Sequence, residues 1–338
     1  MNFINILNHI LRPLEWVVAQ LLTLFHHALV TFGMTAGPSP AWGIAIMCLV
    51  LVIRICLLPL FLSQMRAMQR IQVLQPQIQR IQHKYAARKD PRSKEAMQRE
   101  IMALQQRYNA NPLGSCLPSL IQAPILCSLF YTLQSLPAIA DGNAEPLGGI
   151  DHTMAGDIES SSIFGVRIAD SFGTVASPQS RIIIGVAVAL MCLTLFAIQW
   201  MLIHRNTSKD AMVSPQFRVQ KMTVFVFPVI YVVSGATLPF GVLLYWLTNN
   251  LWNLGQTLCQ LRWFPTPGSA AGERKARRDY EQDNRRRAAA GLPSLEEERA
   301  MAAREEAKAR REREKSAASR NRKQHKTPHL AKRSIVKR

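Results

Sequence analysis

The chain of 338 residues is poor in acidic side chains and has no paired-cysteine motif. It contains 22 Asp and Glu against 41 Lys and Arg, which gives a formal net charge of +19. Its six cysteines fall in or beside apolar runs and form no C-x-x-C pair, so neither a disulfide framework nor a zinc site is predicted. The motifs H-E-x-x-H and G-x-S-x-G are also absent. We therefore expect no enzyme, no cofactor and no bound metal.

Long apolar runs are what the sequence has instead. Hydrophobic residues make up 48% of the chain, and four runs have the roughly 20 residues that a helix needs to cross a bilayer. A shorter fifth run completes the set. The predicted membrane spans are about 42–62, 116–136, 182–203, 219–236 and 241–263. The sequence thus predicts an all-α polytopic membrane protein.

The basic residues between these runs predict an orientation. Residues 63–113 carry ten Lys and Arg against three acids, whereas residues 138–180 carry only Arg167 against six acids. Residues 204–221 are basic again, and the tail 264–338 holds 22 Lys and Arg against 11 acids. Because basic loops stay inside, we expect residues 138–180 to lie outside and the C-terminus in the cytoplasm. This alternation requires the short fifth run to be a span.

The first 35 residues allow several interpretations. Residues 14–30 are apolar, but Glu15, His26 and His27 interrupt them. A cleaved signal peptide and a further span are alternatives. We favour an amphipathic helix at the outer interface, with Trp16 as its anchor.

Residues 63–113 predict a helical hairpin. Two apolar stripes repeat at spacings of three and four, and consist of Ile71, Leu74, Ile78, Ile81 and Tyr85 and of Met97, Ile101, Leu104 and Tyr108. Residues 88–91 form a turn signal between them, and residues 111–114 end the second helix. The hairpin is either a passive spacer or a docking arm whose positive surface suits ribosomal RNA or anionic lipid.

One charged residue, Arg54, lies near the middle of a predicted span. An arginine there costs about 2.5–3.5 kcal/mol on insertion scales, and no acidic residue lies in the other four spans. The neutral polar residues available are Ser119, Gln122, Gln199, Asn249, Asn250, Asn253 and Gln256. We infer a hydrated cavity, open to the cytoplasm and closed to the outside, in which Arg54 is the only fixed charge. The alternative is that Arg54 bonds backbone carbonyls and only stabilises helix packing.

Four stretches in order resemble the YidC/Oxa/Alb family of membrane protein insertases, in its short bacterial YidC form. They are residues 53–60, 68–82, 111–125 and 238–256, within a region of about 42–263. Three departures stand against the family pattern. The outer loop 138–180 matches poorly, Phe240 replaces a usually small residue, and Val50 replaces a frequent threonine.

The resemblance implies a five-helix core, 42–263, around a hydrophilic groove, with a mobile cytoplasmic hairpin. It makes Arg54 the charge of the groove, Gln199 a groove glutamine and Trp246 a contact for the incoming client. With Gln122 and Asn250, these are the expected substrate-groove residues. The expected function is insertion and folding of nascent integral membrane proteins in the bacterial cytoplasmic membrane, alone or with the Sec translocon.

The expected partners are nascent membrane proteins, membrane lipids and the ribosome, which would bind the hairpin and the basic tail 264–338. No DNA partner is expected. We expect the tail to be largely disordered, because it is rich in charge and poor in apolar residues. An anion-conducting channel or transporter that uses Arg54 is the alternative function, although the sequence shows no internal repeat of the kind such transporters contain.

Overall fold

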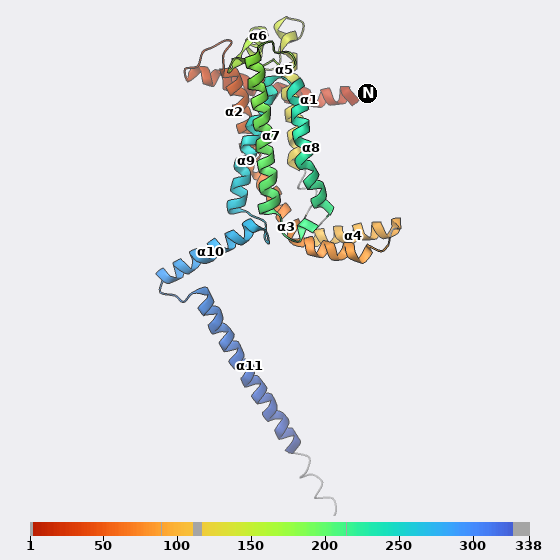
Figure 1. The fold of residues 1–338 in the computed structure, drawn as a ribbon, viewed down its shortest axis with the longest axis vertical. Helices are drawn as coiled ribbons and strands as arrows, with labels where there is room; N and C mark the ends of the chain where they lie inside the picture. Colours follow the sequence, from red (N-terminus) through yellow and green to blue (C-terminus); the bar gives the residue numbers. More distant parts are fainter. Residues whose placement is uncertain (1–2, 89, 111–116, 214, 327–338) are drawn as a thin grey trace, which may run out of the picture. The chain divides into compact units, whose positions relative to one another are not determined.

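The computed structural model describes residues 3–88, 90–110, 117–213 and 215–326, and this part of the chain is almost entirely helical (Figure 1). The all-α prediction is confirmed. The helices of the first compact unit, residues 1–273, are α1 (Phe3–Thr31), α2 (Ala41–Cys56), α3 (Leu58–Tyr85), α4 (Pro91–Arg107), α5 (Leu117–Ala140), α6 (His152–Ser160), α7 (Pro178–Asn206), the short η2 (Ala211–Val213), α8 (Pro215–Thr237) and α9 (Phe240–Trp263). A small antiparallel hairpin pairs β1 (Ser162–Ile163) with β2 (Val166–Arg167).

Four of the described helices are long and apolar enough to cross a membrane. They contain the segments Leu11–Thr31, Ile121–Ala140, Pro178–Asn206 and Phe217–Thr237. Helices α2 and α3 together form a fifth candidate, bent by 54°. Helix α9 was predicted as a span but does not meet this criterion, because its four Asn and Gln residues between positions 249 and 256 lower its hydropathy. Helix α1 does meet it, so its interfacial position remains a prediction.

The bend between α2 and α3 divides the predicted first span, 42–62. Leu57 ends one helix and begins the next, and its N–H donates to the Ile53 carbonyl at 2.9 Å. Pro59 follows in the first turn of α3, where it has no N–H to extend the hydrogen bonds of α2. The chain therefore changes direction three residues after Arg54, and α3 begins earlier than the predicted hairpin start at residue 63.

One end of the helical bundle is tightly packed. Residues 141–177, called the cap below, contain α6 and the β-hairpin. The main buried cluster joins α1, α2, α5 and α9 to Ile150 and Ile158 of the cap. All the buried residues of α2 lie within its first ten positions, 41–50. The buried residues of α2 thus lie beside the cap, and its half toward Arg54 has none.

The cap also holds the start of α9. Its Asp170 and Ile168 carbonyls accept hydrogen bonds from the N–H groups of Phe240 and Gly241, at 2.7 and 2.9 Å. These are N–H groups that a helix leaves without an internal partner. The Phe240 side chain is 1% exposed and packs between α7, α9 and the β-hairpin. The outer loop and the large residue at position 240, two of the departures noted in the sequence, therefore belong to one packed unit.

Helices α3 and α4 pack against each other as a hairpin (Figure 1). Their contact joins Ile71, Leu74 and Ile78 to Ile101, Leu104 and Ala110. Asp90 caps α4 by accepting from the Ser93 N–H at 2.8 Å. Tyr108 was predicted in the second stripe, but α4 ends at Arg107 and the tyrosine is 48% exposed. The predicted helix end at residues 111–114 lies outside the described residues.

The second compact unit comprises residues 274–338, and its described part, 274–326, is mostly helical, whereas the sequence predicts a largely disordered tail. Helix α10 (Ala270–Ala289) runs into it, and α11 (Leu295–Lys326) follows. Ion pairs one turn apart, Arg277–Glu281 and Arg310–Glu314, support these helices. Ser294 and Glu297 form a capping box at the start of α11, each side chain accepting from the other's N–H. Ion pairs and a helix cap within the tail thus stabilise these helices, whose described residues have no apolar core to pack against. Residues 327–338 lie outside the described part.

We expect Gly241→Ala to lower the free energy of unfolding by about 1–3 kcal/mol, because it overpacks the junction of cap and bundle. A Cβ there would lie 2.7 Å from Ile168 Cγ2 and 3.0 Å from Leu133 Cδ1. Thermal unfolding in detergent measures the change. The matched control is Gly185→Ala in α7, where no atom lies within 4 Å. Equal melting temperatures for the two variants would contradict the packing described here.

Candidate functional site

A cavity of about 370 Å³ lies between α3, α7, α8 and α9. Ten of its lining residues are amides, namely Gln64, Gln69, Gln72, Asn206, Gln220, Asn249, Asn250, Asn253, Gln256 and Gln260. None of the described residues that line it carries a charged side chain. A neutral but strongly polar cavity inside an otherwise apolar bundle is costly to build, because amides lose water when they are buried. This makes the cavity the candidate site.

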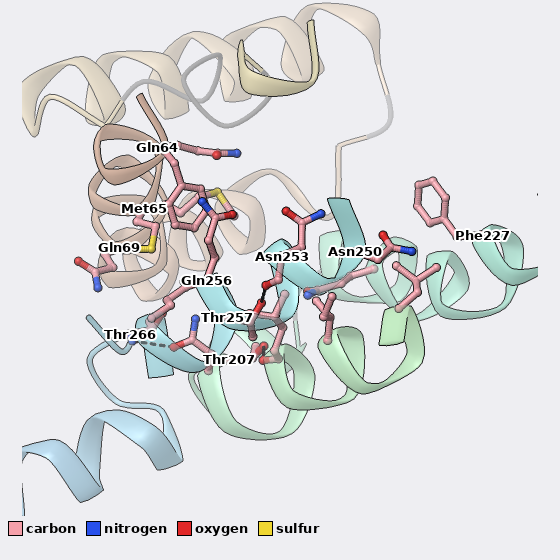
Figure 2. Close-up of a pocket in the computed structure, with 18 of the residues that line it drawn as sticks. Gln64, Met65, Gln69, Thr207, Phe227, Asn250, Asn253, Gln256, Thr257 and Thr266 are labelled. Atoms are coloured by element: carbon pink, nitrogen blue, oxygen red, sulfur yellow. Dashed lines mark hydrogen bonds between the residues drawn. The ribbon is translucent and has the colours of Figure 1, made fainter. Parts of the chain in front are cut away.

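Two helices supply most of these amides from opposite walls. On α9, Asn249, Asn253 and Gln256 recur at spacings of four and three, which places them on one face of the helix. On α3, Gln64 and Gln69 lie across the cavity from them. Figure 2 shows the two helices on either side, with Asn250 farther along, near Phe227 of α8. The α9 face was predicted from its spacing, whereas the glutamines of α3 were not.

Arg54 meets the cavity through an amide. Its Nε donates to Asn249 Oδ1 at 2.7 Å, and its Nη2 bonds the same oxygen. Asn249 lines the cavity, but Arg54 is half-buried and does not belong to the lining. The guanidinium thus pairs with a neutral side chain of α9, one of the partners that the sequence offered. Arg54 was expected to lie inside the cavity, but its guanidinium lies at the edge, bonded to a lining residue.

Gln122 lies on the same side of α9 as Arg54. Its Nε2 donates to the hydroxyl of Tyr245, which lies one turn before Asn249. Tyr245 is 1% exposed and belongs to the main buried cluster. Helices α2 and α5 therefore each send one polar side chain to neighbouring turns of α9. Sequence reasoning missed Tyr245, although its position four residues before Asn249 was a usable signal.

Asn250 is the one expected groove residue that lines the cavity itself. It is 2% exposed, and its Oδ1 accepts from the Tyr231 hydroxyl of α8 at 3.2 Å. Its Nδ2 has no hydrogen-bond partner within the described chain. The ring of Tyr231 also contacts Trp246, with 5.3 Å between centroids. Trp246 packs against both buried clusters and is not part of the lining.

Gln199 is not brought into the cavity. Helix α7 contributes Leu195, Ile198 and Leu202 to the lining, while Gln199 is half-buried beside them. Its role as a groove glutamine therefore stays a prediction. Gln122 likewise lies outside the lining.

The far end of the cavity is formed by the segment that follows α9. Gln69 Nε2 donates to the Phe264 and Pro265 carbonyls, at 2.5 and 3.2 Å. Asn206 Oδ1 accepts from the Thr266 N–H at 2.9 Å, and both residues are buried and line the cavity (Figure 2). These contacts hold the end of α9 to α3 and α7. Nothing in the local sequence pattern predicts them, because they join residues about 60 and 195 positions apart.

The apolar helices and the amide-lined cavity define a polytopic helical membrane protein with a polar site within its bundle. Residues 34–266 match the family model described as 60Kd inner membrane protein, and the chain belongs to this family.

Similar curated proteins are each named membrane protein insertase YidC. The one from Bifidobacterium longum is 44% identical over 90% of this chain and 90% of its own length. The one from Streptomyces avermitilis is 34% identical over 79% of this chain and 61% of its own length. The one from Tropheryma whipplei is 30% identical over 81% of this chain and 90% of its own length. The match thus extends well beyond the motifs and includes the cap.

We expect Asn206→Leu to lower the free energy of unfolding by about 1–3 kcal/mol, because the buried Thr266 N–H loses its acceptor. Hydrogen exchange at Thr266 should become faster. The control is Asn253→Leu, which lines the same cavity but whose side chain holds no backbone N–H of the described chain. Unchanged exchange at Thr266 in the Asn206 variant would contradict the assigned contact.

Proposed function

We propose that this chain is a membrane protein insertase that inserts nascent integral membrane proteins and helps them to fold in the bacterial cytoplasmic membrane. The observation that carries the proposal is a neutral, amide-lined cavity beside Arg54 inside an apolar bundle. Family membership supports it, since the relatives carry this function in their names. The work needs no bond-breaking chemistry, which agrees with the absence of an enzyme motif from the sequence.

The first step is entry of a polar segment of the client. The cap seals one end of the bundle, and the cavity lies toward the other end, where α3 and the end of α9 meet. A polar tail that enters there exchanges water for amide partners, so that its desolvation cost falls. We place this entrance on the cytoplasmic side, with the C-terminus in the cytoplasm, because the basic segments favour that orientation.

Arg54 adds an electrostatic term at the edge of the cavity. Its guanidinium is bonded to a neutral amide, so an acidic residue of the client can replace Asn249 as the stronger partner. No acid of the described chain forms an ion pair with Arg54. We expect this attraction to draw acidic client tails partway across the membrane.

The second step is release of the apolar segment into lipid. Helices α7 and α9, the third and fifth predicted spans, present large exposed apolar side chains, among them Phe196, Trp200 and Leu251. A client helix can slide along such a surface while its polar tail occupies the cavity. Each Leu, Ile, Phe or Val that reaches the centre of the bilayer contributes about −0.3 to −0.6 kcal/mol. Lipid burial of the client thus drives the step.

The proposed partners follow from charge and exposure. The α3–α4 hairpin and the tail are basic and suit ribosomal RNA or anionic lipid headgroups. Clients would then be received from the ribosome, with the chain acting alone or beside the Sec translocon.

The test is insertion of a single-span client into liposomes that contain the purified protein with Arg54 changed. We expect Arg54→Lys to insert a client with an acidic tail nearly as well as the unchanged protein. Arg54→Ala should be slower, and Arg54→Glu slowest, because it repels the tail. Arg218→Ala, at the exposed start of α8, is the control.

Two outcomes would count against this account. If Arg54→Glu were as active as the unchanged protein, the electrostatic role would be ruled out. Anion flux through client-free liposomes, lost in Arg54→Ala and without any insertion activity, would favour the channel alternative instead.

Truncation after Ala289 tests the tail. It removes α11 and the basic end of the chain, so we expect cosedimentation with ribosomes to weaken and to depend less steeply on salt. Insertion of a purified client peptide, which needs no ribosome, should be unchanged and serves as the control. Ribosome binding that equals that of the full chain at every salt concentration would remove the tail from the proposed partners.

A further inference from the structure

We infer that the cavity binds the main chain of the client, through its peptide N–H and C=O groups, in addition to the attraction between Arg54 and acidic side chains. The inference rests on the proposed function and names the chemistry that the site recognises. Its ligand is an extended stretch of polypeptide with uncharged side chains. The site recognises the main chain and not the identity of those side chains.

The lining has the chemistry that a peptide group needs. A side-chain amide carries two N–H donors and one carbonyl acceptor, and ten amides line the cavity, although some of their atoms, such as Oδ1 of Asn249 and Oδ1 of Asn206, already bond other residues. None of the described lining residues is charged. A site built to attract acidic side chains would instead place cations along its walls. Here Arg54 lies outside the lining and is bonded to Asn249. The cavity is thus neutral and has donors and acceptors throughout.

Two buried polar atoms of the lining have no partner within the described chain. They are Nδ2 of Asn250 and Oε1 of Gln72, a donor on α9 and an acceptor on α3. Asn250 is 2% exposed, and its other amide atom is bonded to Tyr231. If the amide were turned over, its oxygen would be left without a partner instead, so one hydrogen-bonding atom remains free in either orientation. Both atoms are covered in this conformation, so each can gain a partner when its side chain turns toward the cavity. A peptide group then supplies both complements, since its C=O accepts and its N–H donates.

The polar face of α9 has the length for such a ligand. From Asn249 to Gln260 it covers about 16 Å, at roughly 1.5 Å per residue. About five residues of extended chain, at roughly 3.3 Å each, match that length. An extended chain also points its N–H and C=O groups sideways to both walls, toward the amides of α9 and of α3. Every client carries these groups, so the binding is independent of sequence.

The experiment removes peptide N–H groups from a client without changing its charge. A synthetic single-span peptide carries a neutral tail of Gly and Ser, and its twin has N-methylglycine at two Gly positions of the tail. Both are added to liposomes with and without the full-length protein. Without protein, the methylated twin should cross as fast or faster, because it has fewer donors to desolvate.

With protein, we expect the methylated twin to be inserted more slowly, by about fivefold for each net hydrogen bond that it loses. Asn250→Leu should slow insertion of the unmodified client. It should also reduce the difference in rate between the twins, because the substitution and the N-methylation remove the same hydrogen bond. Gln134→Leu, an exposed amide on α5, is the matched control and should behave as the unchanged protein. The two client peptides are also compared on the unchanged protein, and this comparison does not depend on whether any variant folds.

The possible failures are distinguishable. If the protein does not accelerate the unmodified client over empty liposomes, the proposed function fails. If it accelerates both twins equally, or the methylated twin more, the insertase stands and the main-chain binding is overturned, leaving a cavity that merely holds water.

Discussion

The hydrogen bonds between Arg54 and Asn249 are the interaction on which the site depends. A guanidinium within an apolar bundle needs a partner, and the described part of the chain gives it an amide of α9 instead of a carboxylate. A carboxylate would neutralise the charge and hold it tightly, whereas an amide satisfies the hydrogen bonds and leaves the charge available. The same amide belongs to the lining of the cavity, so the charge and the polar cavity are joined at one residue.

The asymmetry of the bundle gives this arrangement a direction. Beside the cap, α1, α2, α5 and α9 share a buried core, and cap carbonyls satisfy the first N–H groups of α9. Beyond Val50, α2 has no buried residue, and α3 leaves at a bend of 54°. The bend moves α3 away from the path of α2 and lets its glutamines form a wall of the cavity. Buried packing is thus concentrated beside the cap, while the polar cavity lies between α3, α7, α8 and α9.

Several features could be predicted from residues alone, because they follow from composition and periodicity. The apolar runs predict the helices, the stripes around Leu74 and Leu104 predict the packing of α3 on α4, and the spacing of Asn249 and Asn253 predicts a polar face on α9. The sequence predicts a largely disordered tail, whereas its described residues form helices, which pairs such as Arg310–Glu314 and the Ser294 cap support without a core. Tyr108 was assigned to a stripe, although the helix ends just before it.

The sequence by itself determined that the chain is helical, that its helices are apolar enough for a membrane, and that Arg54 must find a neutral partner. Only the tertiary structure decided which partner that is, and that Gln199 lies beside the cavity while Gln64, Gln69 and Asn206 line it. The reason is physical. Periodicity sets which residues share a face of one helix, but bends, caps and contacts between distant residues, such as Gln69 with Phe264, set which faces meet.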